Sequence, residues 1–228
     1  MENIVQRVFA WSGPLFILIM LFCLIVMDFI PPISPALDAA AVAAFYNENR
    51  LGIRFGSTIM MQGCVLMMLC VTAISLQLRR IEGKVAIFST IQLVSGVFAN
   101  ALFVFSAAAW TLAAFRPERD VADIQAWNDI GWFLLLMPAT ILSLQGIAIG
   151  LAILLKRDQQ LYPRWVGYFN LWFAILFLPG ALVTFFKTGP FAWDGILVFW
   201  LALGLFASWA FVMAWSTDRA IRTPDAGT

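Results

Sequence analysis

Residues 8–29 read VFAWSGPLFILIMLFCLIVMDF, a run in which Asp28 is the one charged residue. About 20 consecutive apolar residues, wound as a helix, cross the roughly 30 Å hydrocarbon core of a bilayer. Comparable runs follow at residues 55–78, 85–112, 131–155, 166–186 and 195–216. These runs predict an all-α integral membrane protein, a bundle of six helices.

The composition supports this class. Hydrophobic residues make up 62% of the chain and charged residues 12%, whereas about a quarter of a soluble domain is charged. The first apolar run is too long for the core of a signal peptide and lacks an A-x-A cleavage site, so we expect it to stay as an anchor. We predict one transmembrane domain over residues 1–217 and a cytoplasmic tail over residues 218–228.

The basic residues predict the orientation of the bundle. Cytoplasmic loops carry an excess of lysine and arginine. The side that holds both termini would carry nine of these residues, against five on the opposite side: Arg50, Arg54, Arg116, Arg119 and Lys187. Both termini are therefore predicted to be cytoplasmic, in a bacterial inner membrane.

The chain contains no histidine. Imidazole is the usual neutral ligand of haem iron, copper, zinc and non-haem iron, so its absence argues against most membrane redox and metalloenzyme chemistry. Cys23, Cys64 and Cys70 lie within apolar runs without C-x-x-C spacing. The sequence also has no nucleotide-binding loop and no basic tract typical of nucleic-acid binding. We expect no metal, no cofactor and no nucleic-acid partner.

Two short amphipathic surface helices are predicted on the extracytoplasmic side. In the first, Ser34 would cap the helix, Pro35 would take its first position, and Asp38 would complement the dipole in the first turn. In the second, over residues 116–130, Asp120 would be the cap and Gly131 would allow a bend into the fourth span. We expect both helices to lie flat on the bundle or the membrane.

Ionisable and aromatic side chains gather at the same extracytoplasmic boundary. Glu48 and Asp194 are the best candidates for a catalytic acid–base pair, with Asp129 in reserve. Arg50 or Lys187 would then hold an anionic group of the substrate. The alternative is that these charges are structural, as caps or salt bridges that fix loops at the ends of the spans.

Polar and helix-breaking residues within the spans suggest a binding pocket in the outer half of the bundle. Prolines that interrupt two helices at the same depth are a common way to build a site in transporters. The alternatives are ordinary proline kinks and amide hydrogen bonds between helices. The expected pocket and its mouth are formed by Gln62, Asn100, Gln145, Pro138, Pro179, Arg50, Trp127, Lys187 and Trp193.

Gly146 and Gly150 stand four residues apart in the fourth span. Small residues at this spacing let two membrane helices approach closely. We therefore predict that this face of the fourth span is a helix-packing surface.

Four short segments carry a resemblance: QLRRIEG at 77–83, GYFNLW at 167–172, FLPG at 177–180 and FKTGPFAW at 186–193. They resemble a group of uncharacterised bacterial polytopic membrane proteins. The resemblance implies a bacterial inner membrane, and it brings no established activity or catalytic residues.

Three functions fit these observations. The first is binding or passage of a hydrophobic or amphipathic small molecule through a pocket open to the extracytoplasmic face, which requires a cavity in the outer half of the bundle. The second is an accessory subunit or assembly factor that docks a membrane partner or a second copy, which requires exposed outer aromatic residues. The third is a cofactor-independent enzyme acting on a lipid or isoprenoid, which requires the carboxylates to surround one cleft.

Overall fold

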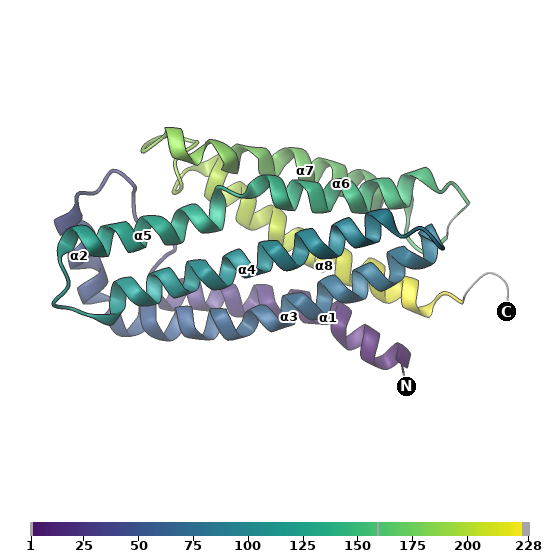
Figure 1. Ribbon diagram of the computed structural model, residues 1–228, viewed down its shortest axis with the longest axis horizontal. Helices are drawn as coiled ribbons and strands as arrows, with labels where there is room; N and C mark the ends of the chain where they lie inside the picture. Colours follow the sequence, from purple (N-terminus) through teal and green to yellow (C-terminus); the bar gives the residue numbers. More distant parts are fainter. Residues whose placement is uncertain (1, 159, 225–228) are drawn as a thin grey trace.

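The computed structural model describes residues 2–158 and 160–224. Within these residues, six helical segments are long and apolar enough to cross a membrane, and they run side by side (Figure 1). The prediction of a six-helix membrane bundle is confirmed. The segments are α1 (Glu2–Val26), α3 (Arg50–Glu82), α4 (Ile87–Phe115), the interrupted helix α5 (Val121–Leu136) and α6 (Ala139–Leu155), α7 (Arg164–Phe177) with the 3₁₀ segment η1 (Leu178–Phe185), and the π-helical segment η2 (Ile196–Trp200) with α8 (Leu201–Arg222).

The helices form a closed ring. Helix α3 packs on α1 and α4, α6 packs on α4 and α7, and α8 packs on α1 and α7. Both termini lie at the same end of the bundle, as an even number of spans requires (Figure 1). We call this end the inner end and the opposite end, where α2 (Ala39–Glu48) lies, the outer end.

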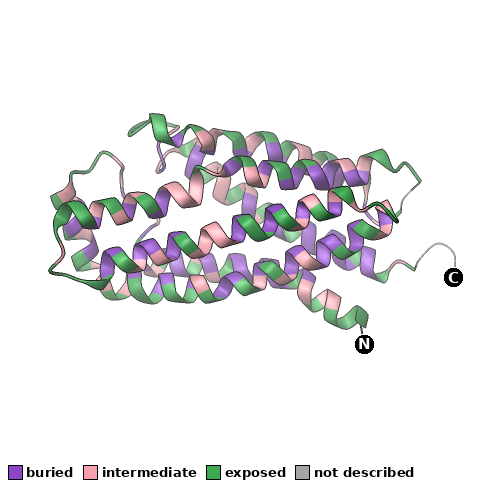
Figure 2. Ribbon diagram, viewed as in Figure 1, coloured by how far each residue is buried: buried purple, intermediate pink, exposed green. Residues whose placement is uncertain are grey.

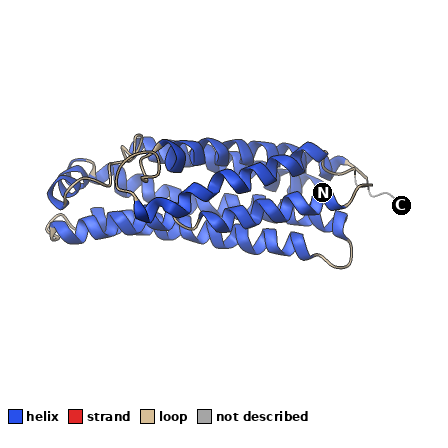
Figure 3. Cartoon of the chain, turned by 90° about the horizontal axis from the view of Figure 1, so that it is seen from above, coloured by secondary structure: helices blue, strands red, loops and turns tan. Residues whose placement is uncertain are grey.

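The outward surface of the ring is apolar. Figure 2 shows exposed residues along the helices at the front of the bundle, and in α1 the exposed apolar residues include Leu18, Phe22 and Ile25. An apolar surface of this extent is a liability in water, but lipid tails cover it in a bilayer. The loops lie toward the two ends of the bundle (Figure 3), where water or headgroups satisfy their backbone groups.

The first surface helix is present, but it begins later than predicted. Helix α2 starts at Ala39, and its cap is Asp38, whose carboxylate accepts a hydrogen bond from the Ala41 amide at 2.8 Å. The prediction that Ser34 caps this helix is wrong. The Ser34 hydroxyl accepts a bond from the Ala36 amide at 3.4 Å, within the turn that precedes the helix.

The second predicted surface helix is the outer part of the fourth span. Asp120 caps it as predicted, accepting from the Ala122 amide at 2.9 Å. The helix then continues without a bend through Gly131 to Leu136. Gly131 is needed for packing rather than for a bend, because a Cβ there would collide with the indole of Trp110.

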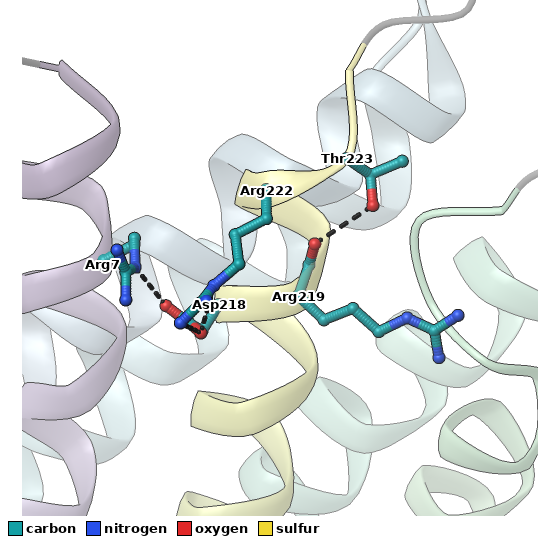
Figure 4. Close-up of polar contacts among 5 residues, drawn as sticks. All are labelled: Arg7, Asp218, Arg219, Arg222 and Thr223. Atoms are coloured by element: carbon teal, nitrogen blue, oxygen red, sulfur yellow. Dashed lines mark hydrogen bonds and ion pairs between the residues drawn. The ribbon is translucent and has the colours of Figure 1, made fainter.

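Three charged residues join α1 to α8 at the inner end (Figure 4). The Asp218 carboxylate accepts from Arg7 Nε at 2.6 Å and from Arg222 Nε at 2.9 Å. The Thr223 hydroxyl then donates to the Arg219 carbonyl at 3.1 Å. Helix α8 includes the first five residues of the expected tail, 218–222. Residues 225–228 of that tail lie outside the described part of the chain.

Replacing Asp218 with asparagine should lower the free energy of unfolding by about 1 kcal/mol. Both arginines are partly exposed, with 42% and 60% of their side-chain surface accessible, so solvent weakens the pair. Thermal unfolding in lipid nanodiscs measures the loss, and 0.5 M salt should narrow it. Asp158→Asn, at an exposed inner-loop position, is the matched control. An equal loss of stability in both variants would contradict a stabilising role of the Asp218 ion pairs.

Candidate functional site: a cavity at the centre of the bundle

Two helix interruptions and the irregular start of the sixth span lie together in the bundle. The fourth span breaks at Pro138 between α5 and α6, and the fifth becomes a 3₁₀ helix at Leu178–Phe185, which contains Pro179. A Cβ on Gly180 would lie 2.8 Å from the Leu136 carbonyl oxygen and 2.9 Å from Ala139 Cβ, so the two breaks touch. The sixth span begins as the π-helical segment η2, which packs against η1.

An apolar cavity lies beside these breaks. It has two parts, of about 60 Å³ and about 30 Å³, and we call them together the central cavity. Pro138 and Gly180 line the smaller part, while Met20 and Met60 line the larger part. Both parts share lining residues from four spans: Phe103, Leu135, Leu136, Leu142, Phe177 and Ala202.

A smaller pocket adjoins the central cavity; its wall is mostly apolar, and we call it the polar pocket after the two buried amides that line it. Its volume is about 10 Å³, and Asn100 and Gln145 line it. It shares Phe103 and Leu142 with both parts of the central cavity, and Phe206 with the larger part. The Asn100 and Gln145 side chains are 1% and 2% exposed. The structure therefore joins an apolar cavity to a pocket that holds two buried amides.

Each amide has one atom without a hydrogen-bond partner. The Asn100 amide nitrogen donates to the Cys64 carbonyl at 2.9 Å, but Asn100 Oδ1 accepts no bond from any described residue. Gln145 Nε2 likewise finds no acceptor in the described part of the chain. Buried polar atoms are nearly always bonded, so this acceptor and this donor require an explanation.

The predicted pocket residues divide into two groups. Asn100, Gln145 and Pro138 line the cavities, and Pro179 is adjacent to the lining residue Gly180. The assignment of Gln62 to the pocket is wrong, because its side chain is exposed on the outside of α3. Helix α3 is apolar on both its inner and outer faces, so depth along the sequence does not tell which face a residue occupies.

The predicted catalytic carboxylates come from three separate parts of the chain. Glu48 is exposed at the end of α2, and Asp194 lies half-exposed in the loop before η2. Asp129 accepts a hydrogen bond from the amide of Asn128 at 3.0 Å. The three carboxylates lie on different elements, and their acid–base pairing stays a prediction.

The predicted cations have separate positions. Arg50 donates to the Ala114 carbonyl at 3.0 Å and to the Phe115 carbonyl at 2.8 Å. These carbonyls are at the C-terminus of α4, where a cation is favourable. Arg50 is therefore a helix cap, as the structural alternative holds. Lys187 is exposed in the loop after η1.

The predicted tryptophans belong to the packing of the outer end. Trp193 is 4% exposed, and its indole donates to the Ile33 carbonyl at 2.7 Å. It stacks on Trp132 with ring centroids 6.3 Å apart. Trp127 is half-buried, with the Arg119 guanidinium 6.0 Å from its ring centroid.

Buried aromatic rings lie between the central cavity and the outer loops. Phe199 lines the cavity and contacts Trp132 at 6.0 Å between ring centroids. Trp132 in turn lies 5.0 Å from Trp110 and 5.2 Å from Phe29. Through Trp193, this cluster reaches the outer loop at Ile33. An occupant that enters from the outer face therefore has to displace these rings.

Asn128 joins this cluster to α2, although it is not among the site residues predicted from the sequence. It is fully buried, and its Oδ1 accepts from the Tyr46 hydroxyl and from Trp132 Nε1, both at 3.1 Å. Burial raises the pKa of Tyr46 well above its usual range, and the nearby Asp129 carboxylate adds to this effect. The signal in the sequence is the i,i+4 pair of Asn128 and Trp132 on one helix face.

The described residues contain no group of three or more histidine, cysteine, aspartate and glutamate side chains placed to hold a metal ion. Comparisons of this chain with protein-family models, with curated proteins and with solved structures find no match.

Proposed function

We propose that this chain is a bacterial inner-membrane protein with cytoplasmic termini that binds a hydrophobic or amphipathic small molecule in the central cavity. The observation that carries the proposal is the position of the cavity. It lies beside the breaks of the fourth and fifth spans and the π-helical start of the sixth, and it shares lining residues with a pocket that holds two buried amides with unused hydrogen-bonding atoms. Broken helices around a site near the middle of the membrane are typical of proteins that bind and release small molecules there.

The energetics favour an occupant. An empty apolar cavity of 60 Å³ costs about 1.4 kcal/mol at roughly 24 cal/mol per Å³, and a bound apolar group recovers this energy. Pro138 has no amide proton, so it cannot donate to the Leu134 carbonyl one turn earlier. Leu134 lines the smaller part of the cavity. The helix break at Pro138 thus removes a backbone hydrogen bond beside the cavity.

The size of the cavity restricts the ligand. Pockets for drug-sized ligands measure about 300–1,000 Å³, much larger than the two parts found here. Met20 and Met60 in the wall are flexible side chains that adapt to an occupant. We therefore expect a slim, flexible chain, such as an acyl or prenyl chain, rather than a fused ring system.

The two other functions have less support. An accessory subunit that docks through outer aromatic residues needs them on the surface, yet Tyr46 is 1% and Trp193 is 4% exposed. An enzyme that uses outer carboxylates needs them around one cleft, and none of Glu48, Asp129 and Asp194 lines the central cavity. The central cavity therefore offers the better site.

Filling the cavity should abolish ligand retention. Ala202 lines both parts of the cavity, so Ala202→Phe places a ring in the space of the ligand. Native mass spectrometry of protein extracted with its membrane lipids should show a small molecule on the wild type and at least tenfold less on this variant.

The matched control is Gly204→Phe on the same helix. Gly204 is exposed, and a Cβ there meets no atom within 4 Å, so its added ring should leave retention unchanged. No retained molecule on the wild type, or equal retention on both variants, would contradict the proposal.

A further inference from the structure

We infer that the occupant of the central cavity is a long-chain alcohol whose hydroxyl binds between Asn100 and Gln145. This inference rests on the proposed function, since it names the chemical class of the ligand. Two observations carry it: a buried acceptor and a buried donor without partners among the described residues, and the lining residues Phe103 and Leu142 that their pocket shares with the central cavity.

The hydrogen bond to Cys64 fixes the orientation of the Asn100 amide. Asn100 Nδ2 donates to the Cys64 carbonyl, a group that only accepts, so Asn100 Oδ1 is the atom left unbonded. Gln145 Nε2 lies against α4 at Gly96, where a Cβ would come within 2.7 Å of it. Gly96 therefore makes room for the donor, and the pocket presents one acceptor and one donor.

A hydroxyl group is the smallest ligand group that satisfies both atoms. Its proton is donated to Asn100 Oδ1, and its oxygen accepts from Gln145 Nε2. An ether, ketone or ester only accepts, so Asn100 Oδ1 would remain unsatisfied. A carboxylate or an ammonium group would bring an unpaired charge into the middle of the bundle, at a high desolvation cost.

The surrounding residues place the carbon chain of the alcohol. Phe103 and Leu142 line the polar pocket and both parts of the central cavity. A hydroxyl held by the amides therefore directs its chain into the apolar space. The other polar side chain of the pocket wall, Trp209, donates to Asn170 Oδ1 at 2.9 Å and does not compete for the hydroxyl.

A single water molecule also carries a donor and acceptors, and the polar pocket has about the volume of one water. The two occupants differ in one consequence. A resident water would satisfy the amides regardless of the lipid present, so an alcohol would gain nothing over an ether of the same length. Competition between these two compounds separates the cases.

The probe is dodecan-1-ol with a diazirine at mid-chain, photolysed with the full-length protein in lipid nanodiscs. Peptide mapping locates the label, which we expect near Phe103, Leu142 and Phe206. Unlabelled dodecan-1-ol, dodecyl methyl ether and dodecane serve as competitors. The alcohol should compete about tenfold better than the ether, because the ether leaves a buried acceptor unpaired.

Gln145→Met removes the donor and keeps the side-chain volume, and it should reduce labelling about tenfold. The same substitution at the exposed Gln62 is the matched control and should leave labelling unchanged. Without probe, Gln145→Met should lower the melting temperature little, because the donor it removes has no partner among the described residues. A purely structural role of Gln145 predicts a much lower melting temperature instead.

The outcomes separate the inference from the proposed function. Equal competition by alcohol and ether, or unchanged labelling of Gln145→Met, would overturn the alcohol assignment while leaving an apolar ligand site in place. The absence of label from the central cavity, with an alkane diazirine as well as with the alcohol, would overturn both.

Discussion

Gly146→Leu should prevent assembly of the bundle or destabilise it by more than about 3 kcal/mol. Gly146 lies where α6 crosses α7, and a Cβ there would be 2.8 Å from the Asn170 carbonyl oxygen and 3.1 Å from Phe173 Cδ1. The first of these atoms belongs to the backbone, so no side-chain rotation relieves the collision. The helices would have to separate, which also exposes the contact of Gly150 with the Gly167 carbonyl.

Thermal unfolding in nanodiscs and the yield of monodisperse protein measure this effect. Gly204→Leu adds the same side chain to α8, where it faces open space, and should unfold within about 0.5 kcal/mol of the wild type. A Gly146→Leu protein as stable as the Gly204→Leu protein would contradict the close approach of α6 to α7 at Gly146.

Asn128→Leu should cost about 2–5 kcal/mol of stability. The substitution leaves the Tyr46 hydroxyl and the Trp132 indole without their acceptor in a fully buried site, and each orphaned group costs roughly 1–3 kcal/mol. The loss should be local to the outer end, where Asn128 joins α2 to the fourth span. Hydrogen exchange should accordingly increase first in α2.

Tyr46→Phe is the companion variant. It removes one donor and leaves Asn128 Oδ1 bonded to Trp132, so it should cost only about 1 kcal/mol. Combined with Asn128→Leu, it should cost less than the sum of the two single variants, because the orphaned hydroxyl is then absent. Additive losses would show that the hydroxyl and the amide do not interact.

The sequence predicts the architecture well because each span is a physical requirement of the bilayer. A helix of about 20 apolar residues has one role in a membrane, and all six such runs form spans. Asp120 caps the helix expected of it, and the glycines Gly146 and Gly150 lie at a close helix crossing. Pro138 and Pro179 interrupt two helices that touch at their breaks.

Other features depend on which face of a helix turns inward. A membrane helix is apolar toward lipid and toward its neighbours, so its sequence has little amphipathic pattern to orient it. Depth along the sequence therefore predicts Gln62 in the pocket, although its side chain faces outward. The same ambiguity prevents a prediction of the hydrogen bond between Asn128 and Tyr46, which are 82 positions apart in sequence.

For a related reason we propose the predicted pocket of Asn100 and Gln145 as the site, rather than the predicted carboxylates at the outer boundary. Charged groups at the ends of spans serve loops and helix ends, as Arg50 does at the C-terminus of α4. Buried amides such as Asn100 and Gln145 are rarer in the interior, and two atoms left unbonded there are more informative about a ligand. Which amide atoms lack a hydrogen-bond partner is known only once the packing of the helices is known.

The most direct test of the central claim is an electron cryo-microscopy map of the full-length protein purified with its native lipids, with a bound antibody fragment to aid alignment. We expect elongated density in the central cavity, beside Phe103 and Ala202, that ends at Asn100 and Gln145. A cavity closed by its own side chains, or one that holds no density beyond a single water between the two amides, would contradict the account.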